Sequence, residues 1–455
     1  VAWRISDEPW MGWSRRALDN AKIRFSAGSM GNGNVSPYSY TSEMTVSTAD
    51  DIVLGGSYPS YTSVGSTVPV SLTWEKSTTY DVGLDLDFFN NRLSVSGDYY
   101  RRYTTDMYTA SVALPAVYGT GSPKGNNAEM KTDGWELSLS WRDSFKLGGK
   151  PFDYSIKAMV WDSKSVITKY VNDTGSLGTV KGFIENGGSP SSYYVGMTVG
   201  EIWGYTVAGL FRDQADIDSS AIHDFVQASD KVTRPGQVKI ADLDGNGFID
   251  PGNFAVDDHG DLRIIGNQSP RYRYGVNLSA RWNGIGLSVF LQGVGARDWY
   301  PGSDAGMFWG KYGRPFFALI PSIHNYTDDM YSAERNNWDT AYWPRMTTYQ
   351  SNGTKNWTRL LEIPNTRYIQ SAAYLRVKNI QLDYSFPKHI CSAIRLQGLK
   401  IYVNAENLFT FTPLHKYAPN FDPEGLSYDS DFASAADGYT YPILKSVTVG
   451  VNITF

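Results

Sequence analysis

The chain has 455 residues and a formal net charge of −5, which gives no basis for binding nucleic acid. Its mean hydropathy is −0.35, and no apolar run is long enough for a transmembrane helix. A membrane β-barrel is still allowed, because its strands are apolar on one face only. A single cysteine, Cys391, excludes an internal disulfide. We expect Cys391 to be a small residue in a turn.

The first residues predict a strand that is already under way. They are Val-Ala-Trp-Arg-Ile-Ser, with no export signal before them, so we expect the C-terminal portion of a longer protein. Ile23, Phe25 and Ala27 then alternate with polar residues. Residues 28–71 are rich in Gly, Ser, Tyr and Thr and predict a long loop.

The clearest predicted hairpin covers residues 79–99. Even positions from 80 to 88 carry Tyr, Val, Leu, Leu and Phe, whereas three odd positions between them carry aspartate. Asn90 and Asn91 predict a tight turn, since asparagine tolerates a positive φ. Three carboxylates on one strand face suit a water-filled lumen better than a soluble core.

The same alternation recurs towards the C-terminus. It predicts strands across residues 135–141, 154–160, 272–282, 285–291, 375–386 and 399–405. Asn283-Gly284 is a strong hairpin signal, and a phase shift predicts a β-bulge near Asn379. The last ten residues alternate without error between Val, Ile or Phe and small polar residues. Trp and Tyr at the ends of the apolar faces predict an interfacial girdle.

The connections decide between a barrel and a soluble sandwich. Short turns lie near residues 90, 148, 284 and 391, and long loops are expected across residues 104–131, 162–270, 294–372 and 411–441. A β-sandwich also has alternating strands, but it has no reason to sort its loops so consistently. We therefore predict an all-β, transmembrane antiparallel β-barrel with short periplasmic turns and long extracellular loops. About 11 strands, an odd number, fit half of a barrel of about 22 strands.

Seven short stretches follow one another over nearly the whole chain. They are Leu-Thr-Trp-Glu-Lys at 72–76, Phe-Phe-Asn-Asn-Arg-Leu at 88–93, Gly-Asn-Gln-Ser-Pro-Arg-Tyr-Arg-Tyr-Gly-Val-Asn-Leu at 266–278, Leu-Ser-Val-Phe-Leu-Gln-Gly at 287–293, Tyr-Leu-Arg-Val-Lys-Asn at 374–379, Asn-Ala-Glu-Asn-Leu-Phe-Thr at 404–410 and Phe-Asp-Pro-Glu at 421–424. In this order they resemble the SusC/RagA family, TonB-dependent outer-membrane transporters of the Bacteroidetes. The terminal Phe455 is similar to the signal that such barrels show to their assembly machinery.

The resemblance implies a 22-strand barrel closed by an N-terminal plug. Residues 1–455 would be its C-terminal part, with the plug and the first barrel half absent from this chain. It also implies a SusD-like surface lipoprotein that caps the external loops, and TonB-ExbB-ExbD acting through the plug. The implied activity is uptake of oligosaccharides or oligopeptides across the bacterial outer membrane.

An acidic stretch has the spacing of an EF-hand-type calcium loop. Asp242, Asp244, Asn246 and Asp250 stand at its positions one, three, five and nine. Position twelve is an asparagine instead of the bidentate glutamate, so we expect weak calcium binding unless Asp257, Asp258 or Asp261 supplies the missing ligand. The alternative is an Asx-rich turn that holds its shape without metal.

Aromatic side chains gather in the predicted external loops. Those expected to bind substrate, together with one arginine for carboxylates, are Trp299, Trp309, Tyr312, Trp338, Trp343 and Arg314. For each single aromatic, the alternative is packing of loop on loop or contact with the lipoprotein cap.

We do not expect an enzyme. The five histidines lack metal-ligand spacing, and no Gly-x-Ser-x-Gly sequence occurs. Two other functions stay open at this stage: a soluble or surface glycan-binding β protein, and a passive porin.

Overall fold

The structure is a computed structural model. It describes residues 1–14, 17–33, 41, 44–65, 72–111, 117, 124–179, 182–183, 188–223, 233–301, 308, 329–345, 363–426 and 443–455. No helix among these residues is long and apolar enough to cross a membrane.

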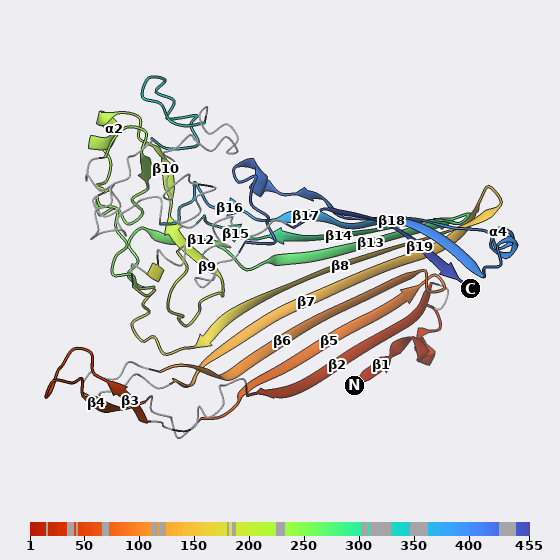
Figure 1. The fold of residues 1–455 in the computed structure, drawn as a ribbon, viewed down its shortest axis with the longest axis horizontal. Coiled ribbons are helices and arrows are strands. Elements are labelled where there is room, and N and C mark those ends of the chain that lie inside the picture. The colour runs from red at the N-terminus through yellow and green to blue at the C-terminus, as the bar shows by residue number, and fades with distance from the viewer. Residues whose placement is uncertain are drawn as a thin grey trace.

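One antiparallel sheet of 11 strands organises the chain (Figure 1). Its strands pair with their neighbours in chain order, which confirms the predicted all-β fold and the strand count. They are β1 (Ala2–Arg4), β2 (Leu18–Asn32), β5 (Glu75–Phe88), β6 (Leu93–Ala110), β7 (Lys124–Leu147), β8 (Lys150–Lys169), β13 (Arg271–Trp282), β14 (Ile285–Ala296), β17 (Tyr374–Ser385), β18 (Gly398–Phe411) and β19 (Ser446–Thr454).

The two faces of the sheet differ in the way that the alternation predicts. Leu84 lies between Ile23 and Gly97 on a face that we call the outer face, where its side chain is 41% exposed. On the opposite, inner face, Arg24 Nε donates to Asp85 Oδ2 at 2.8 Å. Apolar side chains thus cover the outside and charged groups pair on the inside, as a barrel in lipid requires.

The short connections lie together at one end of the sheet and the long ones at the other (Figure 1). Asn90 and Asn91 have φ angles of 59° and 57°, and Asn283 and Gly284 have 50° and 86°. These positive values match the tight-turn prediction, since Asn and Gly tolerate the left-handed region. The predicted β-bulge is also confirmed: the register shifts between Val377 and Asn379 against both neighbouring strands.

Three predictions of detail are wrong. Strand β6 extends to Ala110 and strand β7 begins at Lys124, so the loop between them is shorter than the one expected across residues 104–131. Residues 28–71 are not wholly loop, because β2 runs to Asn32 and a hairpin joins β3 (Met44–Thr48) to β4 (Ser60–Val64). Cys391 lies buried in the short helix α4 (Lys388–Ala393) and not in a turn.

The long connections carry most of the buried core. Three small sheets pair β9 (Glu201–Tyr205) with β12 (Leu262–Asn267), β10 (Val207–Leu210) with β11 (Val238–Ile240), and β15 (Asp298–Trp299) with β16 (Gln370–Ser371). A short helix, α2 (Gln214–Asp218), follows β10. Large side chains here are fully buried, including Ile202, Tyr205, Phe211 and Tyr368. This end of the molecule therefore packs like a soluble domain.

A buried ion cluster fastens the segment after β18 to the barrel. The Arg376 side chain, 3% exposed, donates to both oxygens of Asp422 at 2.7 and 2.8 Å. Glu424 lies 3.3 Å from Arg376 and 2.7 Å from Lys378. Both bonds to Asp422 come from the same guanidinium nitrogen, and hydrogen bonds between charged groups are stronger than neutral ones. Residues 412–426, which we call the latch segment, are held in this way against β17.

The outer face can be tested by adding a charge to it in the intact receptor. Leu84→Arg should cost roughly 2–4 kcal/mol of stability near the bilayer midplane, because the outer face contacts lipid. Ser26→Arg is the matched control, since Ser26 faces inward and lies opposite Asp81. Thermal unfolding in lipid nanodiscs measures both variants. Equal losses would contradict the assignment of faces.

The latch can be tested by removing one charge. Asp422→Asn leaves Glu424 as the only carboxylate of this cluster that pairs with the buried Arg376, so we expect the latch segment to open more easily by about 3 kcal/mol. Hydrogen exchange of residues 412–426 in the intact receptor gives this opening free energy. Glu406→Gln is the control, because Glu406 makes only exposed hydrogen bonds to Asn404 and Ser446. Unchanged exchange in Asp422→Asn would show that the ion cluster does not hold the segment.

Candidate functional site

A polar depression with a volume of about 600 Å³ involves β7, β8, β13, β14 and β17 near the short turns. Four of its residues are matched across neighbouring strands: Asp153 with Arg281, Arg281 with Gly286, and Gly286 with Asp383. Gly286 is required here, because a Cβ at this position would lie 2.7 Å from Asp383 Oδ1. A row over four strands of the inner face thus carries charged groups on three of them, with Gly286 between Arg281 and Asp383.

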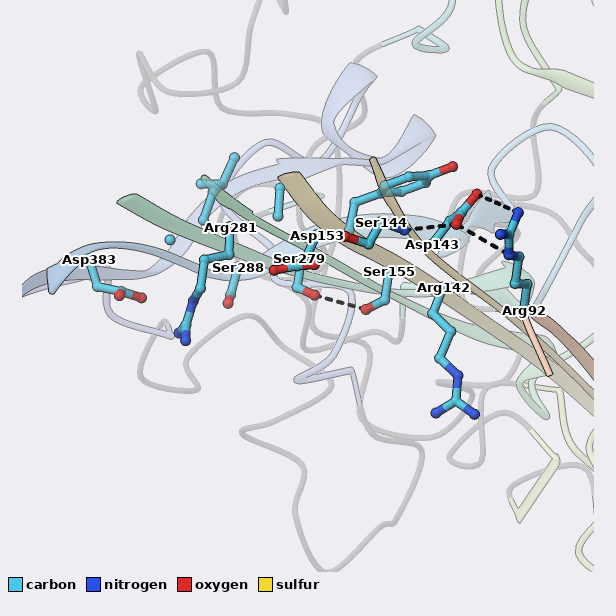
Figure 2. Close-up of a pocket in the computed structure, with 14 residues that line it drawn as sticks. Arg92, Arg142, Asp143, Ser144, Asp153, Ser155, Ser279, Arg281, Ser288 and Asp383 are labelled. Atoms are coloured by element: carbon cyan, nitrogen blue, oxygen red, sulfur yellow. Dashed lines mark hydrogen bonds and ion pairs between the residues drawn. The ribbon is translucent and has the colours of Figure 1, made fainter. Parts of the chain in front are cut away.

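The depression presents both signs of charge. Arg142 and Arg281 extend to the same side of the ribbon (Figure 2). Arg92 pairs with Asp143 at 3.3 Å, and the Ser155 and Ser279 hydroxyls lie 2.8 Å apart. Asp383 is buried, pairs with Lys400 at 3.2 Å, and keeps Oδ2 without a hydrogen-bond donor. Such a surface suits polar or zwitterionic material and brings together no nucleophile with a base.

The predicted acidic loop is compact and largely bonded to itself. Asp242 accepts the backbone N–H groups of Gly245 and Gly247 at 2.7 and 2.9 Å. The Gly247 N–H lowers the pKa of the Asp242 carboxyl. The amide of Asn246 donates to Asp244 and Asp250, so its nitrogen and not its oxygen faces them. The loop therefore has the Asx-turn character that the alternative predicts.

Asp261 completes a group of three carboxylates. Ligand oxygens of Asp242, Asp244 and Asp261 all lie within 4.8 Å of one another. Asp261 is fully buried and accepts the backbone N–H groups of Leu243 and Asp250. Burial raises the pKa of its carboxyl, and the neighbouring carboxylates add to this effect. Oxygen donors at this spacing fit a hard divalent cation, and Asp261 is one of the three substitutes considered for position twelve.

The aromatic residues predicted to bind substrate divide into two groups. Trp299 and Trp343 are buried in the loop core, where Trp299 contacts Phe421 and Trp343 stacks on Tyr368. These two indoles pack loop on loop in this structure, which is the alternative raised for each single aromatic. Trp338 is partly buried against the same core. Trp309, Tyr312 and Arg314 lie outside the described residues.

Some residues of the depression escaped the sequence analysis. Arg92, Arg142, Asp153 and Asp383 were not singled out, because each is an ordinary charged residue on a polar strand face. Only the register between strands shows that they meet. The one feature of the sequence that could have grouped these four residues is that each lies a few residues from a short turn.

Comparison with known proteins agrees with the architecture. A family model described as "TonB dependent receptor-like, beta-barrel" matches residues 15–228. "TonB-dependent receptor P3" of Formosa agariphila is 26% identical over 463 residues, and "TonB-dependent receptor SusC" of Bacteroides thetaiotaomicron is 24% identical over 463 residues. Both alignments cover 100% of this chain, but 41% and 39% of the relatives. The chain thus spans about two fifths of the length of the curated relatives it matches.

Solved structures show the same fold. "Structure of the RagAB peptide transporter" has a TM-score of 0.64 at 18% identity and covers 100% of this chain and 42% of that chain. The RagAB peptide importer in the "closed-closed" state has a TM-score of 0.67 at 19% identity, with 43% of that chain covered. The resemblance to the SusC/RagA family is thereby confirmed. The chain is thus similar over its whole length to TonB-dependent receptors, and its sheet is part of a β-barrel of the bacterial outer membrane.

Proposed function

We propose that the chain supplies eleven strands of a closed outer-membrane barrel that imports short oligosaccharides or oligopeptides. The observation that carries this proposal is the two-faced sheet, with apolar side chains outside and paired charges inside. The edge strands β1 and β19 stand at opposite ends of the strand order. An open edge is unstable in lipid, because its backbone N–H and C=O groups lack partners. Further strands must therefore close the barrel, for a total of about 22.

The inner depression supports a polar cargo. Its mixture of guanidinium, carboxylate and hydroxyl groups matches the zwitterionic backbone ends of peptides and the hydroxyls of sugars. The names of the relatives include both a SusC receptor and a peptide transporter. Import on this design needs a plug that occludes the lumen and a TonB-ExbB-ExbD motor that moves it.

We assign capture of the ligand to the external loops, together with a SusD-like lipoprotein cap. Trp309, Tyr312, Arg314 and Trp338 are the proposed contacts. Trp299 and Trp343 serve the same loops by holding their shape, since both are buried.

Calcium binding by the acidic loop is a separate part of the proposal. Asp242, Asp244 and Asp261 would hold the ion, and Asn246 would turn its oxygen inward to join them. We expect an affinity of about 0.1–1 mM, as in extracellular calcium modules.

The import proposal is tested by isolating the complex from native outer membrane under mild detergent. Mass spectrometry of all chains and of bound small molecules should find a SusD-like lipoprotein, the plug and a short polar oligomer. Mass and fragmentation of the oligomer distinguish glycan from peptide. A soluble, folded monomer would favour the glycan-binding alternative, whereas channel conductance without plug or cap would favour the porin.

The calcium proposal predicts a pH dependence. Calcium should slow hydrogen exchange across residues 242–261 at pH 7, and this protection should fade in mild acid. The reason is that the raised pKa of Asp261 makes its carboxyl take up a proton before ordinary aspartates do. Without calcium the two carboxyls act in opposite directions: as the pH falls, the raised pKa of Asp261 adds stability to the folded loop, whereas the lowered pKa of Asp242 removes it.

A conservative variant separates metal binding from folding of the loop. Asp244→Asn keeps an oxygen for the Asn246 N–H but removes an exposed charge, so it should lose calcium protection and keep the loop. Asp257→Asn, an exposed neighbour outside the carboxylate group, is the control. Equal calcium protection in both variants would overturn the site.

A further inference from the structure

The outer face of β6, β7 and β8 carries a cationic patch just beyond its aromatic girdle. Arg101 and Lys164 are the direct cross-strand partners of Asp133, one on each side. Lys131 lies on the same face and contacts Asp133 at 3.3 Å. Three basic side chains thus surround one carboxylate.

Strand geometry places this patch at the level of the outer-leaflet headgroups. Trp141, near the short turns, and Trp135 lie on one face of β7, with Leu137 and Leu139 between them. Asp133 is eight residues from Trp141, which is about 27 Å along the strand. With a strand tilt of about 40°, Asp133 stands about 20 Å and Lys131 about 26 Å above Trp141, so the patch reaches the upper edge of an apolar band about 25 Å tall.

The position relative to the girdle agrees with this height. Tyr99 pairs with Trp135, and Arg101 pairs with Asp133 one step further towards the long loops. The Tyr99 hydroxyl donates to Asp133 Oδ1 at 3.0 Å. Interfacial Tyr and Trp side chains mark the boundary between hydrocarbon and headgroups. The cations therefore stand on the headgroup side of that boundary.

The patch has an excess of positive charge that the protein does not balance. Asp133 is shared between Arg101 Nε at 2.5 Å and Lys131 at 3.3 Å. Within the described residues, Lys164 forms no ion pair and is exposed. The carboxylate on the girdle side, Asp162, is bound to Arg271 at 2.5 Å and is buried.

Two other lysines on this face differ from the patch, because each has a carboxylate of its own. Lys76 pairs with Asp106 at 3.6 Å, and Lys169 pairs with Glu129 at 3.5 Å. Like charges that gather around Asp133 repel one another unless an anion joins them. The side chains of Arg101 and Lys131 are 42% and 33% exposed, so an anion can reach them from the membrane side.

We propose that Arg101, Lys131 and Lys164 form a binding site for the phosphate of a glycolipid headgroup in the outer leaflet. The planar guanidinium suits a phosphate and the two ammonium groups add point charges, while Asp133 holds Arg101 in place. Tyr99 and Tyr103 present amphipathic rings beside the headgroup. The barrel would thus carry a bound lipid on its outside, independent of the cargo on its inside.

The test uses the intact receptor, purified in mild detergent and titrated with lipid A in mixed micelles. The triple variant Arg101→Gln, Lys131→Gln, Lys164→Gln should bind roughly a hundredfold more weakly, since each basic residue near an anionic surface contributes about fivefold. The control, Lys76→Gln with Lys169→Gln, should stay within about twofold, because those lysines have carboxylate partners. Thermal unfolding of both variants confirms that the barrel is intact.

Two further arms identify the phosphate as the recognised group. Lipid A treated with phosphatase should lose the same affinity, and added salt should weaken binding of the untreated lipid to the wild type. Equal binding by triple variant and wild type, or undiminished binding of the dephosphorylated lipid, would overturn the proposal. If the triple variant lost a co-purifying protein but bound lipid A as tightly as the wild type, the proposal would also be rejected, and the patch would be a contact for a protein partner.

Discussion

The constraint on which this structure depends is the hydrogen bonding of the backbone in lipid. Hydrocarbon offers no partner to N–H and C=O groups, so every strand that crosses it must pair on both sides. The chain meets this requirement with long strands that pair in sequence order. In β7 and β8, for example, the pairing runs from Glu129 opposite Lys169 to Leu147 opposite Lys150. The tight turns at one end keep successive strands adjacent. Once the pairing is set, each strand must show one face to lipid and one to water.

That requirement inverts the usual place of the hydrophobic core. In the barrel, Leu84 and Val449 stay exposed on the outer face, because lipid covers them. The inner face is held by charges such as Arg24, which contacts Asp85 and Asp98 at 2.8 Å each. Among the described residues, most of the buried apolar core lies in the long connections, where side chains such as Ile202 and Phe211 are removed from water. The latch cluster at Arg376 joins these two regions, since it anchors a connecting segment to a barrel strand.

Local patterns were enough to predict the barrel strands, and physical reasons explain where they fail. Alternation is a property of single strands, so the facing of Leu84 and the bulge near Asn379 could be found from sequence. The ends of β6 and β7 near the long connections, residues 104–110 and 124–131, show little alternation of apolar and polar residues, so the sequence analysis missed the full length of these strands. The burial of Trp299 and Trp343 depends on contacts with Phe421 and Tyr368, which are distant in sequence. No local pattern records such contacts.

The same residue type takes a different role according to the face on which it lies. Asp85, on the inner face, is enclosed by Arg24 and Lys22 together with a serine hydroxyl. Asp133, on the outer face, stands among three cations and leaves positive charge unbalanced. Composition and net charge cannot separate these two aspartates, because both are strand residues beside arginine. The register of the neighbouring strands does separate them, and it assigns one to the architecture of the lumen and the other to recognition at the membrane surface.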